Sequence, residues 1–353
     1  MNSIRKLFTS NMSLMSALCA VAISLLLAIL LLWFSGAPPI ETGKLLLEGS
    51  LGNATRLSDT SMVWVPLALA SASLIITFAA GLWNIGVEGQ IIVGAIFASF
   101  VAREFDAPPP LLWGAMIMAG AFGGMFWGGL TGLLRIKGKV NEIFGGLGLT
   151  FVATGLVIYL VIGPWKRAGI ASTSGTAPFD TKAWFPTIME LRISPLAIFL
   201  ALAGLWLVYY LLKQSKFGLQ LRATGINATA ASRLGVRTER NLMLAFLLGG
   251  ILAGIAGTVQ VGAIHHKLVP SISGGYGYLA ILVVLLGNYK SFRSGLISFF
   301  FAMIAVGSIQ WQLRLDLHSS LGGVTQGILV LVTLIVVAIF SQIKRNKRIK
   351  DAS

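Results

Sequence analysis

Charged residues are scarce in this chain of 353 residues. They make up 11% of the sequence, and hydrophobic residues make up 56%. A water-soluble domain carries about 25% charged residues. So few charges cannot keep the surface of a protein of this size in water, which excludes a soluble globular domain. The composition predicts an all-α polytopic membrane protein, because helices satisfy their own backbone hydrogen bonds in lipid.

Other absences exclude further classes. The one cysteine, Cys19, rules out an internal disulfide. The phosphate-binding pattern GxxxxGK[ST] does not occur, so the chain does not hydrolyse ATP by that route and is not expected to be an enzyme. His265 and His266 are adjacent with no cysteine nearby, and no metal site is predicted. The net charge of +15 comes from short basic runs that are not interleaved with aromatic residues, so nucleic acid is not an expected partner.

Long apolar runs dominate what remains, and they predict ten membrane crossings. The runs are residues 13–34, 62–80, 84–102, 111–134, 142–163, 193–213, 241–264, 276–288, 292–311 and 321–341. Nearly all approach the roughly 20 residues that cross 30 Å of hydrocarbon. The exception, 276–288, is predicted to be a partial helix or to extend backward through Gly274. The first run is longer than the core of a cleaved signal peptide, which favours a retained helix.

Basic residues orient this bundle. Ten crossings place both termini on one side, and both termini are basic, including the tail KRNKRIK at 344–350. The positive-inside rule therefore predicts cytoplasmic termini, with the loop RIKGK at 135–139 and the stretch 213–240 on the same side. The segments predicted outside are 35–61, 103–110, 164–192, 265–275 and 312–320. We expect one multi-pass domain, residues 1–353, in the cytoplasmic membrane, with lipid as a partner.

Glycines recur at four-residue spacing in two predicted helices. They are Gly120, Gly124, Gly128 and Gly132 in one helix, and Gly250 and Gly254 in another. Small residues at this spacing let helix backbones approach closely in lipid. The pattern predicts helix packing, either inside the bundle or against another subunit.

The stretch GLWNIGVEGQ, residues 81–90, places polar side chains between two apolar runs. A charged side chain in the middle of a membrane helix costs about 2.5–3.5 kcal/mol on insertion scales and marks a pathway by default. Asn84 and Glu88 share one face if the segment is helical, but the glycines around them weaken a helix. Two interpretations stay open: Asn84, Glu88 and Gln90 shape a substrate path or gate, or the stretch is a turn in which Glu88 caps a helix.

The stretch 214–240 is basic and rich in alanine, with Glu239 as its one acidic residue. Asn227 is a predicted cap for a short helix that begins near Ala228, and Gly235 is a predicted stop. A plain loop of this length is unusual in a compact bundle. We therefore favour a docking element over an ordinary basic loop.

These stretches resemble the membrane permeases of bacterial ATP-binding-cassette importers, in the branch for branched-chain amino acids, ribose and nucleosides. GLWNIGVEGQIIVGA, residues 81–95, is similar to the NIGxEGQ signature of the nucleoside-type permeases. RATGINATAASRLGV, residues 222–236, resembles the coupling loop that docks on the ATPase, although Ala228 and Thr229 replace the proline and glutamate common there. The residues of this chain that the resemblance assigns to the coupling loop are Arg222, Gly225, Asn227, Ala230, Ala231 and Gly235.

The resemblance implies a type II-like importer permease of about ten helices, which moves a small solute, a nucleoside by its motif. It also implies cytoplasmic ATP-binding subunits, a second permease in a homo- or heterodimer, and an extracellular substrate-binding protein. ATP and Mg are then bound by the partner subunit, and this chain binds no cofactor. A simple sugar or a branched-chain amino acid stays open as the substrate. A transporter driven by an ion gradient is the rival class.

Overall fold

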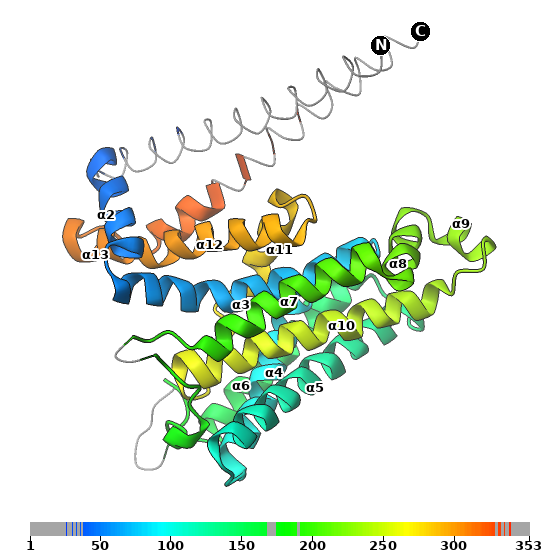
Figure 1. Ribbon diagram of the computed structural model, residues 1–353, viewed down its shortest axis with the longest axis horizontal. Coiled ribbons are helices and arrows are strands. Elements are labelled where there is room, and N and C mark those ends of the chain that lie inside the picture. The colour runs from blue at the N-terminus through cyan, green and yellow to red at the C-terminus, as the bar shows by residue number, and fades with distance from the viewer. Residues whose placement is uncertain are drawn as a thin grey trace. The chain divides into compact units, whose positions relative to one another are not determined.

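The computed structural model describes residues 38–167, 174–188 and 191–328, with isolated positions at either end. Every regular element in these ranges is helical, which confirms the predicted all-α class (Figure 1). The predicted first crossing 13–34, Cys19, the tail 344–350 and part of the crossing 321–341 lie outside the described residues.

Most helices follow the predicted apolar runs, but residues 39–51 and 54–61, which lie in a segment predicted outside the membrane, are also helical. The helices are α2 (Pro39–Leu51), α3 (Ala54–Ala79), α4 (Val87–Glu104), α5 (Pro109–Ile136), α6 (Glu142–Ile162), η1 (Thr181–Ala183), α7 (Pro195–Gln214), α8 (Lys216–Ile226), α9 (Ala228–Arg233), α10 (Thr238–Val259), η2 (Gln260–His265), α11 (Tyr276–Leu286), α12 (Ser291–Gly307) and α13 (Ile309–Leu315). Six helical stretches in the described ranges are long and apolar enough to cross a membrane.

Two boundaries inside the apolar runs differ from the sequence expectation, and a third run forms the short helix that was predicted. The helix expected from residue 84 begins at Val87, because a glycine-containing turn precedes it. The run 292–311 is divided at Ser308 between α12 and α13. The run 276–288 forms an 11-residue helix, α11, about 16 Å long at 1.5 Å per residue. That is half of a bilayer core, so the prediction of a partial helix is confirmed.

The chain divides into two compact units. The smaller unit comprises residues 1–57 and 303–353. Its described core joins α2 and α13, where the Trp311 indole N–H donates a hydrogen bond to the Thr42 carbonyl (2.9 Å) beside buried Leu45. The larger unit, residues 58–302, contains the two predicted functional stretches.

Helix α4 is largely enclosed within the larger unit, and it packs against α5, α6 and α10. Helices α5 and α10 lie side by side (Figure 1). The glycine rows face each other at their contact: a Cβ placed on Gly124 would lie 2.6 Å from the Gly254 Cα, and one on Gly250 would lie 3.0 Å from the Met125 Cα. Farther along α5, Gly132 packs against the Met243 and Phe246 side chains. The four-residue glycine spacing thus gives a close helix contact within the chain.

Parts of several segments predicted on the same side of the membrane meet at the same end of the larger unit, although the segment 265–275 reaches inward to Glu88 through Gly275. At one end, the Lys182 ammonium contacts the Asp106 carboxylate at 2.9 Å, and the backbone N–H of Thr176 bonds the Leu268 carbonyl. At the other end, the backbone N–H of Trp83 donates to Glu142, which also pairs with Arg135. The sequence places the first group outside and the second inside.

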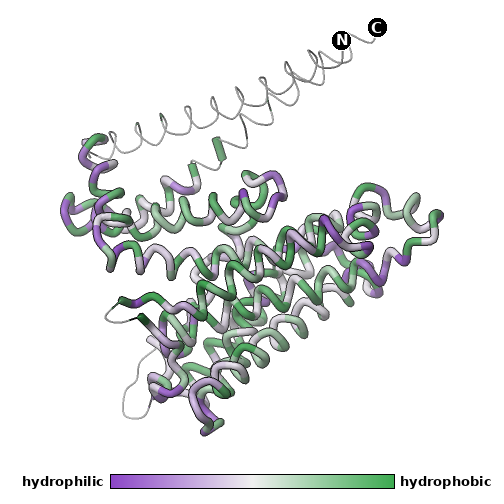
Figure 2. Tube along the Cα trace, viewed as in Figure 1, coloured by the Kyte–Doolittle hydropathy of each residue, from purple (hydrophilic) through white to green (hydrophobic). Residues whose placement is uncertain are grey.

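Hydrophobic residues run along the long helices (Figure 2), and many of their side chains are exposed. They include Leu111, Met118, Phe122, Phe126, Phe144, Phe151, Phe199, Leu202, Trp206 and Leu296. Hydrophilic residues gather toward the helix ends, for example around α8 (Figure 2). A water-soluble protein rarely exposes such continuous apolar surface, so these flanks fit lipid.

Candidate functional site

Glu88 caps the N-terminus of a helix that lies far along the chain. Its side chain is 4% exposed. One carboxylate oxygen accepts the backbone N–H of Gly275 at 3.1 Å, and the other accepts the N–H of Gly277 at 2.7 Å. These N–H groups belong to the N-cap and first turn of α11, where the helix dipole favours negative charge. The carboxylate therefore fixes the start of the half-length helix.

Glycine is required on the α11 side of this contact. A Cβ placed on Gly277 would lie 2.5 Å from a Glu88 carboxylate oxygen and 2.8 Å from the Glu88 backbone nitrogen. Gly275 has φ +73°, a left-handed conformation that glycine adopts without strain. The GGYG sequence at the start of α11, residues 274–277, thus lets the helix start approach the Glu88 backbone.

Asn84 and Gln90 form a reciprocal amide pair. The Asn84 Nδ2 donates to Gln90 Oε1 at 3.3 Å, and the Gln90 Nε2 donates to Asn84 Oδ1 at 3.3 Å. Both side chains are fully buried. The pair ties the turn to the first part of α4, so the three predicted polar residues lie together but serve two separate contacts. Asn84 precedes α4 and does not share a helical face with Glu88.

Backbone contacts hold the turn from several sides. Gly86 packs on Gly146 of α6, where a Cβ on Gly86 would lie 2.9 Å from the Gly146 Cα. Gly81, with φ +76°, packs on Gly225 at the end of α8. Gly225 belongs to the stretch 214–240, so the two polar stretches picked out from the sequence touch each other.

The stretch 214–240 forms two short helices, α8 and α9. The Asn227 side chain accepts the N–H of Ala230 at 3.0 Å, which confirms the predicted cap of the helix that begins at Ala228. Gly235 follows α9 with φ +84°, as a helix stop requires. Arg222, Asn227 and Ala230 are exposed, whereas Ala231 is buried. A docking role for these residues remains a prediction.

The sequence did not single out the cavity at the opposite end of the bundle. It has a volume of about 530 Å³ and is lined by Asp59, Met62, Val63, Trp184, Thr187, Leu191, Arg192, Ala263, Ile264 and His266. The Trp184 and His266 rings stack with centroids 4.1 Å apart and planes 14° from parallel. His266 follows the π-helix η2 directly and has φ +52°. Six of these residues come from three segments predicted outside, and the other four come from the outer ends of two predicted crossings.

The ion pair between Lys182 and Asp106 lies at the predicted outer end of the bundle and helps to line another cavity. The hydrogen bond from Lys182 to Asp106, with the charges of Asp106 and Asp180, raises the pKa of the Lys182 ammonium. The Trp113 indole N–H also donates to the Lys182 carbonyl at 3.0 Å. These contacts hold the segment around η1 on the start of α5.

The sequence of the chain is similar to those of known membrane permeases. Residues 56–338 match the sequence model of the family described as branched-chain amino acid transport system / permease component. A guanosine ABC transporter permease protein of Bacillus subtilis is 27% identical, over 90% of this chain and 92% of that protein. A glucose ABC transporter permease protein of Haloferax volcanii is 29% identical, over 83% and 80%. A nucleoside ABC transporter permease protein of Lactococcus lactis is 24% identical, over 82% of each.

Proposed function

We propose that this chain, which belongs to the family of permease components of branched-chain amino acid transport systems, is the membrane-spanning subunit of an ATP-binding-cassette importer for nucleosides. The observation that carries the proposal is similarity along nearly the whole chain to permeases named for guanosine and nucleosides. The chain supplies the path through the membrane and contains no ATP-binding motif of the GxxxxGK[ST] type.

Two features of the chain support a nucleoside. The NIGVEGQ signature, residues 84–90, resembles that of nucleoside-type permeases. The stacked rings of Trp184 and His266 line the cavity at the outer end, with Asp59 and Arg192 beside them. Aromatic rings stack on planar bases, and charged side chains hydrogen-bond hydroxyl groups. A nucleoside combines both kinds of group.

Glucose is the second candidate substrate. The Haloferax volcanii relative named for glucose is as similar to this chain as the nucleoside relatives are. A sugar would use the same polar side chains of the outer cavity without the need for a flat ring above it. Branched-chain amino acids are a third substrate class within the family. They would need an apolar pocket for the side chain and charged partners for the ammonium and carboxylate groups.

The partners follow from the proposed role. Cytoplasmic ATP-binding subunits, which hold ATP and Mg, dock on α8 and α9, where Arg222, Asn227 and Ala230 are exposed. An extracellular binding protein delivers the substrate to the outer end. A second permease, identical or similar to this chain, completes the path. The membrane is the cytoplasmic membrane, with both termini inside.

A continuous backbone route joins the docking surface to the Glu88 turn. Gly225, in the last turn of α8, touches Gly81, and the turn then leads to Glu88, whose carboxylate holds the start of α11. A shift of α8 driven by the ATPase subunits would therefore move the Glu88 turn and α11. In this mechanism Glu88 positions a half-length helix beside the path, and it does not need to touch the substrate.

The test of the substrate is uptake by the reconstituted complex. The chain, its ATP-binding subunits, its second permease and its binding protein are placed in vesicles with ATP on the ATPase side. We expect tritiated guanosine uptake to be inhibited by excess unlabelled nucleosides and not by glucose or leucine. Uptake of labelled glucose without uptake of guanosine would assign the second candidate instead.

A further inference from the structure

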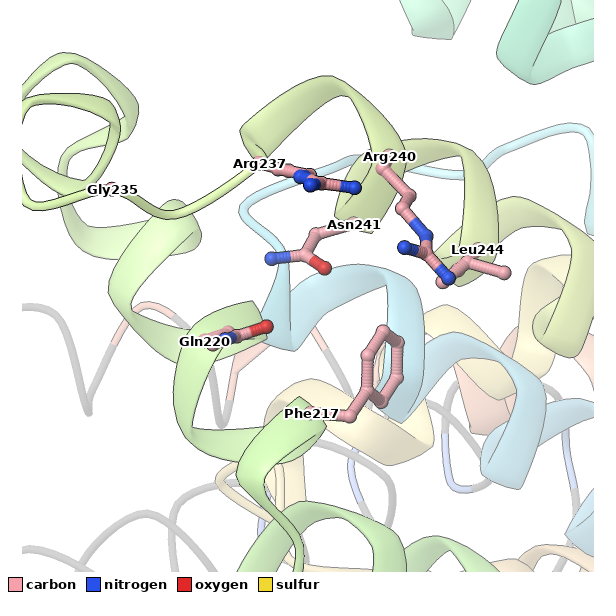
Figure 3. Close-up of a pocket in the computed structure, with 7 residues that line it drawn as sticks. All are labelled: Phe217, Gln220, Gly235, Arg237, Arg240, Asn241 and Leu244. Atoms are coloured by element: carbon pink, nitrogen blue, oxygen red, sulfur yellow. The ribbon is translucent and has the colours of Figure 1, made fainter.

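Another cavity lies at the predicted cytoplasmic end, between α8 and the start of α10. Its volume is about 360 Å³, within the range of small-ligand sites. It is lined by Phe217, Gln220, Gly235, Arg237, Arg240, Asn241 and Leu244. In Figure 3 the Arg237 guanidinium lies above the Asn241 amide and the Arg240 guanidinium lies to its right, while Gln220 and Phe217 lie below it.

The polar lining is rich in hydrogen-bond donors. Among the described residues, neither Arg237 nor Arg240 takes part in an ion pair, and both are exposed. Asn241 is 3% exposed, and its Nδ2 has no hydrogen-bond partner in the described part of the chain. A buried amide donor without a partner is costly. The nearest acidic residue in the sequence, Glu239, does not line the cavity.

The donors also surround the N-terminus of a long helix. Arg237 is the N-cap of α10, and Arg240 and Asn241 lie in its first turn. Free N–H groups and the helix dipole favour an anion at this place. Guanidinium groups bind phosphate oxygens in pairs. The buried Asn241 donor, independent of the helix terminus, indicates a ligand with several acceptor oxygens.

The level of the cavity indicates where the phosphate comes from. Helix α10 is one of the stretches long and apolar enough to span the membrane, and the span begins at Thr238. Another such stretch, α7, ends at Gln214, three residues before Phe217. The cavity therefore lies where two spans leave the hydrocarbon, at the depth of lipid headgroups. Basic pockets between helices at this depth bind anionic headgroups, and Phe217 and Leu244 add apolar walls.

We propose that the cavity formed by Arg237, Arg240 and Asn241 binds the phosphate of an anionic phospholipid of the inner leaflet. The proposal shares with the proposed function only the cytoplasmic placement of this end of the bundle. The two arginines grip the phosphate oxygens, and the Asn241 amide donates the additional hydrogen bond. A lipid held here also braces α8 against α10, next to the predicted ATPase docking surface.

The test is lipid binding by the purified full-length chain, measured by native mass spectrometry without ATPase subunits or substrate. The probes are phosphatidylglycerol, phosphatidylcholine with the same acyl chains, and inorganic phosphate. We expect phosphatidylglycerol to bind about tenfold more tightly than phosphatidylcholine, since phosphatidylcholine carries a choline cation beside the same phosphate and the two arginines repel that cation. The double variant R237Q/R240Q removes this preference. The variant N241D, which keeps the side-chain shape and adds a negative charge, weakens phosphatidylglycerol binding as well.

A charge-matched control distinguishes specific lipid binding in the cavity from general electrostatic attraction of an anionic lipid to a basic surface. The double variant R222Q/R233Q removes the same charge from exposed residues of α8 and α9 outside the cavity. It should leave phosphatidylglycerol binding within about twofold of the wild type. Equal losses in both double variants would overturn the proposal, as would inorganic phosphate binding as tightly as the lipid. Affinity of R237Q/R240Q for the ATPase subunits is measured separately; if that variant kept lipid binding and lost only this affinity, the proposal would fail and the cavity would instead hold a protein carboxylate.

Discussion

The backbones of Gly81 and Gly225 touch, and this contact joins the two polar stretches of the chain. A Cβ placed on Gly81 would lie 3.0 Å from the Gly225 carbonyl oxygen, and one on Gly225 would lie 2.9 Å from the Gly81 nitrogen. Gly81 begins the turn that leads to Glu88, and Gly225 ends the helix that presents the predicted docking residues. Neither position has room for a side chain without a backbone shift.

The variant Gly225→Ala tests whether this contact transmits motion. The added methyl group separates α8 from the Gly81 turn, which alters coupling between sites by about 0.5–2 kcal/mol, or ~2- to 30-fold in rate. We expect substrate uptake to fall by that factor while ATP hydrolysis by the assembled complex continues. The measurement is the ratio of substrate moved to ATP hydrolysed in vesicles.

Gly148→Ala is the matched control, because a Cβ at Gly148 in α6 meets nothing within 4 Å. Its ratio should equal that of the wild type. An unchanged ratio in the Gly225→Ala complex would show that the contact between Gly81 and Gly225 does not couple ATP hydrolysis to transport.

Removal of the Glu88 carboxylate should destabilise the start of α11. Glu88→Ala leaves the Gly275 and Gly277 N–H groups without their acceptor, and an unsatisfied buried donor costs about 1–3 kcal/mol. Glu88→Gln keeps an acceptor and should lose about half as much. Thermal unfolding of the purified chain in detergent measures both.

The control is Glu104→Gln, at the exposed C-terminal end of α4, the helix that also contains Glu88. This variant should change the free energy of unfolding by less than about 0.5 kcal/mol. The same Glu88→Ala protein, expressed at a normal level, should take up substrate slowly. Wild-type uptake by this variant would remove Glu88 from the mechanism.

The Asn84–Gln90 pair should show strong coupling in a double-mutant cycle. Each single alanine variant leaves the other amide buried and unpaired, which costs about 1–3 kcal/mol. The double variant N84A/Q90A leaves neither amide behind, so its loss should be smaller than the sum by about 0.5–3 kcal/mol. Additive losses in unfolding measurements would mean that the two amides act independently.

Close packing of α5 on α10 should be sensitive to a single methyl group. Gly124→Ala places a Cβ 2.6 Å from the Gly254 backbone, and overpacking of this kind costs about 1–3 kcal/mol. Gly155→Ala adds the same methyl group to α6 where nothing lies within 4 Å, and should keep or raise stability. A Gly124→Ala chain that unfolds at the wild-type temperature would contradict the tight contact.

The sequence predicted the helical class and most helix positions, because long apolar runs and the cap at Asn227 are local signals. It also marked Glu88 as a costly charge. It did not predict what the carboxylate binds, since the partner groups at Gly275 and Gly277 are backbone atoms almost 190 residues away. Backbone donors carry no side-chain signature. The pairing of Asn84 with Gln90 rather than with Glu88 depends on where α4 begins, and glycine-containing turns leave that boundary open.

The outer cavity was missed for a similar reason. Trp184 and His266 lie in separate loops, and neither loop shows a motif by itself. Only the fold brings their rings together. The sequence did predict which polar segments lie on the outer side of the membrane. Residues from three of these segments help to line the cavity, so the predicted topology was the one available signal for it.

ATP-dependent nucleoside uptake tests the central claim most directly. The chain is reconstituted with and without its ATP-binding subunits, and guanosine entry is followed under ATP alone, a proton gradient alone and a sodium gradient alone. The account predicts uptake only with the ATP-binding subunits, the binding protein and ATP present together. Guanosine uptake by the chain alone, driven by either ion gradient, would contradict it.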